Sequence, residues 1–260
     1  MKQIVVRLSL VVLIGFCWTY KSYAGPADYG FITIFNDHML SSEDLLLRFS
    51  HRFNKENFPS GGTIPTFNLD YNFGSIHTAL AYASRSPKEA ELSLGWHLLN
   101  GDPFSLDLKG GFSTLDHNLI GEVRLIKGFK WVGFGGFFRG MSNAYDTSGD
   151  GKVDSHLFSV GVGMGLMIIP GLNLVGEAGF PLIDKDNDYT PSWGGGIQYW
   201  IPNSPHVLSL QLSNMGPFTS RGSTLTDKTI KFSYEWATSI PIRTKKDEKL
   251  DDLFENVEEE

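Results

Sequence analysis

The stretch FSVGVGMGLMIIPGLNLVGEAGF, residues 158–180, contains two runs in which apolar residues alternate with small or polar ones. The apolar positions are Phe158, Val160, Val162, Met164, Leu166 and Ile168 in the first run, and Leu172, Leu174, Ala178 and Phe180 in the second. Pro170 and Gly171 form a short connection between them. Successive side chains of a strand point to opposite faces, so this alternation predicts a β-hairpin whose strands each have one apolar face.

The same period of two recurs throughout residues 44–242 and predicts an all-β chain of about twelve strands (about 10–14). The candidate strands are 45–53, 66–73, 76–84, 90–98, 104–112, 119–126, 132–138, 158–168, 172–180, 192–201, 206–213 and 229–236. Most are about nine residues long, which is the length that a tilted strand needs to cross a bilayer.

The connections between these strands alternate in length. Short ones follow every even-numbered strand, at 74–75, 100–102, 128–130, 170–171 and 202–205. Longer ones lie at 54–62, 113–117, 140–156, 181–190 and 214–227, and only 85–88 departs from the trend. Tight turns at one end and longer loops at the other are typical of an antiparallel up-and-down transmembrane β-barrel. The sequence therefore predicts such a barrel in the bacterial outer membrane, with the short turns facing the periplasm.

The second face of the strands is small or charged, and in a barrel it would line the lumen. Its charged members are Arg48, Arg52, Lys109, Arg124, Arg139 and Lys231 against Asp70, Glu91, Asp107, Glu122, Glu177 and Glu235. Its glycines are Gly133, Gly135, Gly161, Gly163, Gly165, Gly194 and Gly196, which indicate open space on that side. A soluble sandwich is the alternative, but aromatic residues near strand ends, such as Trp96 and Trp236, favour a lipid-facing exterior.

The two ends of the chain differ from the barrel region. Residues 1–24 have the basic start, short apolar run and small-x-small site of a cleaved signal peptide, with Cys17 as an alternative lipid attachment site. Residues 25–43 are expected to be a periplasmic or plug segment ahead of the barrel at 44–242. Residues 243–260 form an acidic tail that is predicted to be disordered, or to bind a periplasmic partner. The net charge of −7 lies mostly in this tail and excludes a nucleic-acid footprint.

The segment DTSGDGKVDS, residues 146–155, carries a partial calcium-binding pattern. Asp146, Ser148, Asp150, Lys152 (through its carbonyl) and Asp154 are the candidate ligands, and Gly151 permits the sharp turn. Leu157 stands where a bidentate Glu belongs, so the pattern predicts weak binding in what would be the longest external loop. A solvated loop is the alternative. With the acidic segment DKDNDY, residues 184–189, it could bind lipopolysaccharide phosphates through divalent ions.

Enzymatic activity has little support in the sequence. Asp116-His117 and Asp154-Ser155-His156 lie in predicted external loops, but neighbouring Asp and His residues imply no shared geometry. Neither a GxSxG nor an HExxH motif follows residue 24. The prediction is therefore that the chain is not an enzyme and carries no cofactor other than possible Ca²⁺.

Three segments carry a family resemblance: LLLRFSHRFN (45–54), HVLSLQLSN (206–214) and IKFSYEW (230–236). They resemble an uncharacterised family of bacterial outer-membrane β-barrel proteins, catalogued as a domain of unknown function, over residues 30–242. Asn54 stands where that family has Gly. The resemblance implies location and fold, and it supplies no catalytic residues.

The sequence thus favours a narrow channel, or a component of a transport or surface system, for small solutes. The alternative is a closed structural or adhesion-type barrel that acts through its external loops. Twelve strands lie between the filled eight-stranded barrels and the water-filled porins of 16–18 strands, so strand number alone does not decide between them.

Overall fold

The computed structural model shows a closed barrel of twelve antiparallel strands, each paired with its sequence neighbours. It describes residues 44–54, 63–84, 88–99, 104–129, 131–145, 155–182, 190–202, 204–216, 219–224, 226 and 229–242. The strands are β1 (Asp44–Asn54), β2 (Thr63–Asn72), β3 (Ile76–Ala83), β4 (Glu89–Leu99), β5 (Ser105–Ser113), β6 (Asn118–Gly128), β7 (Val132–Tyr145), β8 (Ser155–Ile169), β9 (Leu172–Leu182), β10 (Ser192–Trp200), β11 (His206–Ser213) and β12 (Lys231–Pro241). The predicted strand number and architecture are confirmed.

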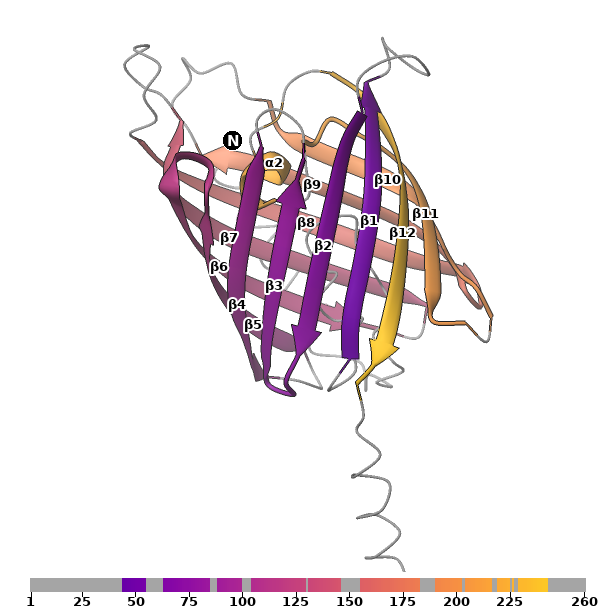
Figure 1. Cartoon of the computed structure of the whole chain (residues 1–260). Coiled ribbons are helices and arrows are strands. Elements are labelled where there is room, and N and C mark those ends of the chain that lie inside the picture. The colour runs from indigo at the N-terminus through magenta and orange to yellow at the C-terminus, as the bar shows by residue number, and fades with distance from the viewer. Residues whose placement is uncertain are drawn as a thin grey trace, which may run out of the picture.

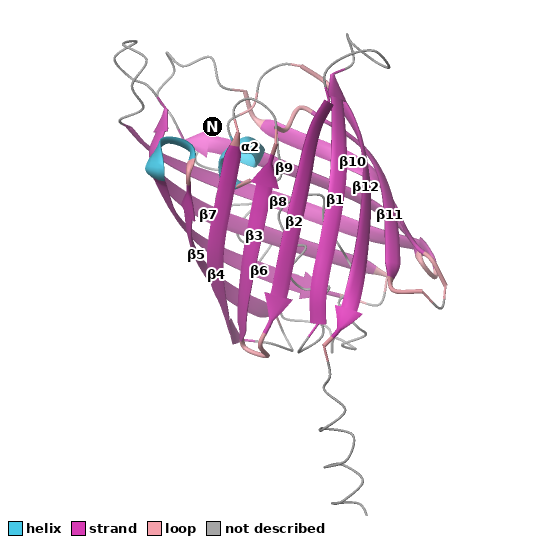
Figure 2. Ribbon diagram, viewed as in Figure 1, coloured by secondary structure: helices cyan, strands magenta, loops and turns pink. Residues whose placement is uncertain are grey.

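The barrel closes where β1 pairs with β12, in a register that joins Asp44 to Pro241 and Asn54 to Lys231. β1 therefore begins and β12 ends at the same end of the barrel, where the short turns lie (Figure 1). We call this the turn end. The opposite end is the loop end, where β1, β3, β5, β7, β9 and β11 finish and where the short helix α2 (Ser220–Thr224) lies. Besides α2, the described residues contain the 3₁₀ turn η3 (Leu115–His117), and strands make up nearly all of the rest (Figure 2).

The two faces of the wall differ in chemistry. Large apolar side chains point outward on every strand, and many are about half exposed, as with Leu94 (61%) and Leu210 (56%). The alternate, inward side chains are mostly polar or charged and buried. A closed barrel satisfies all its backbone hydrogen bonds between strands, and an apolar exterior is stable in hydrocarbon. The fold therefore places the chain in the bacterial outer membrane, in contact with lipid. None of the helices in the described ranges has the length and apolar character needed to cross a membrane.

The loop end differs from the sequence expectation at two connections. β7 and β8 extend to Tyr145 and from Ser155, so the connection between them is 146–154 and not 140–156. It is consequently shorter than the 214–230 connection, and the prediction that it is the longest loop was wrong. The residues that extend these strands, such as Ser142 and Asn143, lack apolar alternation, which is why the period of two missed them.

The inward glycines leave less open space than their sequence pattern indicated. A Cβ atom on Gly161 would overlap the ring of Phe137, which lies on the inner surface of β7 and is 8% exposed. The Arg139 guanidinium stacks over the same ring, with its Cζ 4.8 Å from the ring centroid. At Gly161, the missing side chain makes room for an aromatic ring that fills part of the interior.

We expect Gly161→Ala to lower the free energy of unfolding by about 1–3 kcal/mol, because the added methyl group displaces the Phe137 ring. Denaturant titration of the barrel in lipid vesicles measures this change. Gly121→Ala is the matched control, because Gly121 faces outward and has open space around its Cβ position. Combining Gly161→Ala with Phe137→Leu should recover part of the loss. Equal stability of Gly161→Ala and wild type would contradict this account of the glycine.

Candidate functional site: a strap across the barrel mouth

The connection between β11 and β12 folds into the loop end of the barrel. We call its described residues, 214–216, 219–224 and 226, the strap. Met215 and the hydroxyl-bearing residues Thr219, Ser220, Ser223, Thr224 and Thr226 are all buried. The strap includes α2, which lies inside the ring of strands near the loop end (Figure 1). The sequence predicted an external loop here and assigned inward folding only to residues 25–43, which lie outside the described residues.

On one side the strap is held by two glutamates of β4. Thr219 Oγ1 donates a hydrogen bond of 2.6 Å to Glu89 Oε2, and Ser113 Oγ on β5 donates one of 2.7 Å to Glu89 Oε1. The backbone N–H of Ser220 donates to Glu91 Oε2 at 2.6 Å, and its hydroxyl donates to Glu91 Oε1 at 2.7 Å. Hydrogen bonds to charged acceptors are stronger than those between neutral groups, so the two glutamates bind the strap strongly to β4.

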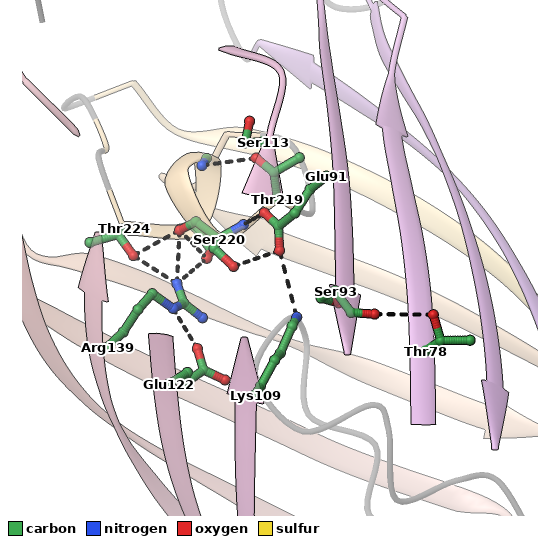
Figure 3. Close-up of polar contacts among 12 residues, drawn as sticks. Thr78, Glu91, Ser93, Lys109, Ser113, Glu122, Arg139, Thr219, Ser220 and Thr224 are labelled. Carbon is green, nitrogen blue, oxygen red and sulfur yellow. Dashed lines mark hydrogen bonds and ion pairs between the residues drawn. The ribbon is translucent and has the colours of Figure 1, made fainter. Parts of the chain in front are cut away.

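On the other side the strap is held by Arg139 of β7. Its Nη1 donates to the Ser220 carbonyl at 2.8 Å, to Ser223 Oγ at 2.9 Å and to Thr224 Oγ1 at 2.7 Å. Figure 3 shows Ser220 between Glu91 and Arg139, in contact with both. The strap starts at the end of β11 but is anchored on β4 and β7, so it reaches across the mouth to the far wall.

The base of the strap is tied to the start of β10. Asn214 Oδ1 accepts the Trp193 N–H at 2.7 Å, and Asn214 Nδ2 donates to the Pro191 carbonyl at 2.9 Å. Thr226 forms an isolated β-bridge with Thr190 and donates its hydroxyl to the Thr190 carbonyl at 2.9 Å. Both chain segments of the strap are therefore fixed where they leave the wall.

Beneath the strap, β4 to β7 carry buried charges of both signs. We call Glu89, Glu91, Lys109, Glu122, Arg124 and Arg139 the charged wall. Glu122 accepts hydrogen bonds from the Nε atoms of Arg124 and Arg139, one on each carboxylate oxygen. Lys109 Nζ lies 3.6 Å from Glu91 Oε1. Figure 3 shows this wall meeting the strap at Glu91 and Arg139. Its charges neutralise one another, so it carries no large field of one sign.

A second set of buried charges lies around the seam between β1 and β12. Arg48 Nε is 3.4 Å from Glu235 Oε1, and Arg52 interacts electrostatically with Glu177 and Glu235. A third pair lies on β4 and β5, where His97 Nδ1 and Asp107 Oδ1 are 2.7 Å apart and both residues are buried. The His77 ring lies 4.8 Å from the His97 ring.

All twelve charged residues assigned to the lumen from sequence lie on inward positions; Lys109 is half-buried and the others are buried. The structure joins ten of them into the groups described above. Of the other two, Asp70 interacts electrostatically with Glu235, and Lys231 Nζ donates to the Asn214 carbonyl at 3.2 Å. Sequence reasoning missed Glu89, His77, His97 and the whole strap. Glu89 and the two histidines do fall on the inward period of their strands, so a complete reading of that face would have found them.

Of the other candidate residues, the structure describes Asp116, His117 and His156. Asp146, Ser148, Asp150, Lys152 and Asp154, the proposed calcium ligands, lie outside the described residues, as do 184–189 and the tail. Within the described ranges, no three His, Cys, Asp or Glu side chains converge where they could hold a metal ion. Asp116 and His117 form the strained turn η3, with φ of 57° and 51°, and the His117 ring stacks on Phe112 at 6.2 Å. His156 is exposed near the start of β8.

A closed ring of antiparallel strands with an apolar outside, a charged inside and an inward-folded connection defines a porin-like outer-membrane barrel. Solved structures of this class are similar to the chain. The NanC porin matches with a TM-score of 0.56 and 11% identity, covering 75% of this chain and 98% of its own. The KdgM porin matches with a TM-score of 0.55 and 8% identity, covering 75% and 99%. Neither a family model nor a curated protein sequence matches the chain. These likenesses show the fold.

Proposed function

We propose that the protein is a narrow outer-membrane channel for small polar solutes, with the strap as its constriction. The observation that carries this proposal is the strap itself, which crosses the mouth of a polar lumen and is anchored on the opposite wall at Glu91 and Arg139. Rings of charged side chains and local constrictions are the means by which channels select what passes.

The lumen is narrow as well as polar. Arg52, Arg139 and Glu122 point inward and are 0%, 2% and 3% exposed, so side chains fill much of the cross-section. This supports passage of small solutes and argues against a wide aqueous pore of the kind found in barrels of 16–18 strands.

The charge balance bears on the kind of solute. One solved structure of the KdgM porin is described as a complex with disordered oligogalacturonate, which is an acidic oligosaccharide. A channel for such a polyanion would be expected to carry a surplus of basic residues. Here the buried arginines of the charged wall are paired with Glu122, so the barrel has no such surplus at this wall.

We expect the purified protein to give small, discrete conductance steps in planar lipid bilayers in KCl solution. The physical reason is that a polar lumen holds water and ions, while the strap limits the cross-section. A barrel preparation unfolded by heat before addition is the control. If folded protein gives no steps above the lipid background, the channel proposal is wrong.

The second candidate is a closed structural barrel, favoured by the deep burial of the inward side chains and by the firm anchoring of the strap. The same conductance measurement separates the two functions, because a closed barrel gives no steps.

A further inference from the structure

We propose that β10 and β11 form a binding face for neutral, polyhydroxylated solutes, of the size and chemistry of a small sugar. This proposal rests on the proposed channel function and names its solute class. The face consists of Gln198 and Trp200 on β10 with Ser209, Gln211 and Ser213 on β11, and we call it the amide panel.

The amide panel lies on two neighbouring strands without charged inward side chains, between Glu177 of β9 and the residues Lys231 and Glu235 of β12. Both strands are described in full, and their inward positions hold no Asp, Glu, Lys or Arg. β10 and β4 stand opposite each other in the ring of twelve strands, so the panel faces the charged wall across the lumen. A solute that passes beneath the strap therefore lies between a self-neutralised wall and an uncharged one.

The panel also has hydrogen-bonding groups that the protein does not use. Gln198 and Gln211 are each 1% exposed, yet Gln198 Oε1 and Gln211 Nε2 have no hydrogen-bond partner in the described structure. The buried hydroxyls of Ser209 and Ser213 also have no hydrogen-bond partner in the described structure. Buried polar groups nearly always have partners, because leaving one without costs roughly 1–3 kcal/mol. These groups lie on the inward face of the wall, and the hydroxyl groups of an entering solute would supply the missing partners.

The side chains stand close enough to act together. Gln198 is paired in register with Ser209, and Gln211 lies at the next inward position of β11. The Gln211 side chain packs against Gly196, where a Cβ would come within 2.9 Å of Gln211 Cγ. The absence of a side chain at Gly196 therefore leaves room for the Gln211 side chain.

Trp200 closes the panel towards the turn end. It occupies the next inward position after Gln198 and packs against the apolar cluster of Leu46, Val207 and Ala237. Its Nε1 is buried without a hydrogen-bond partner in the described structure. An indole offers a large apolar face and one N–H donor, while primary amides offer both donors and acceptors. A ring with several hydroxyl groups matches this combination.

The same arrangement disfavours charged solutes. An ion that leaves water without meeting an opposite charge loses several kcal/mol of hydration, and the amide panel offers no such charge. On β12, Glu235 is in register with Ser209 and lies 3.4 Å from Arg48 Nε, while Lys231 is in register with Ser213 and donates to the Asn214 carbonyl. At the amide panel, a neutral ring is therefore favoured over a charged ring of the same size.

Three probes with one ring and different charge test the proposal: glucose, glucosamine and glucuronate. Their labelled forms are offered to liposomes that contain the full folded barrel, and the rates of uptake are compared. We expect glucose to enter several-fold faster than either charged probe. Faster uptake of glucuronate or glucosamine than of glucose would overturn the proposal while leaving the channel function intact.

A pair of variants tests the panel itself. Gln198→Leu combined with Gln211→Leu should reduce glucose uptake about tenfold, because two hydrogen bonds to the solute are lost, while KCl conductance stays within about twofold. Asn118→Leu is the matched control, since Asn118 is equally buried and unpartnered but lies on β6 beside the charged wall. Unchanged glucose uptake in the double variant, with normal KCl conductance as proof of folding, would overturn the proposal. Absence of any conductance or uptake in the wild type would remove the channel function and this proposal together.

Discussion

Replacing residues 215–226 by a short Gly-Ser link should raise the single-channel conductance roughly threefold or more, because the strap occupies the mouth of the barrel. The strap is not part of the β-ladders, and every strand keeps its neighbours when it is removed. The barrel should therefore still fold and insert. Conductance in planar bilayers, with current steps compared at equal salt, measures the change.

A triple substitution makes the same test without a deletion. Combining Thr219→Ala, Ser220→Ala and Thr224→Ala removes the hydroxyl anchors to Glu89, Glu91 and Arg139 but keeps all wall charges. The open current should rise and flicker as the strap detaches for part of the time. Shortening the 146–154 connection by a similar link is the control and should leave the conductance unchanged. If removal of the strap does not alter the current, the constriction lies elsewhere.

The largest expected loss of stability follows from neutralising Glu122. Glu122→Gln leaves Arg124 and Arg139 buried without the carboxylate that both of them contact. Removing one partner of a buried ion pair costs about 3–5 kcal/mol, since the remaining charge stays out of water. Denaturant titration in lipid vesicles should therefore show a large fall in the free energy of unfolding.

A second substitution separates lost charge pairing from lost packing. Adding Arg124→Gln to Glu122→Gln removes one of the two buried guanidiniums that Glu122 contacts, so part of the stability should return. A loss below about 1 kcal/mol for Glu122→Gln alone would mean that water reaches the charged wall and screens it.

The strands could be predicted from sequence because each has two chemically different faces. Phe158, Val160 and Val162 meet lipid while Ser159, Gly161 and Gly163 face inward, and this contrast appears directly as a period of two. The alternation of short and long connections then indicated which end of each strand lies at the turn end of the barrel. The alternation of side chains also identified most of the luminal charges. A charged residue between two lipid-facing apolar neighbours must point into the barrel, because side chains alternate between the two faces of a strand.

The strap could not be predicted in the same way. It has no periodicity, and its decisive contacts join residues far apart in sequence, such as Ser220 with Glu91 across 129 positions. The pairing of Glu122 with Arg139 likewise depends on the register between β6 and β7, and the apolar alternation within each strand does not specify that register. One signal was present: the 214–226 segment has no acidic residue but several Ser and Thr residues, a composition suited to bonding with buried charges.

The pairing of β1 with β12 sets the order in which the molecule can be assembled. Until β12 arrives, the sheet has two unpaired edges and cannot lie in hydrocarbon, where exposed backbone groups find no partner. These edges come from opposite ends of the 44–241 sequence, so no shorter piece of the chain is a stable insertion intermediate. The polypeptide must therefore be kept from aggregating until β12 can pair with β1 and close the barrel.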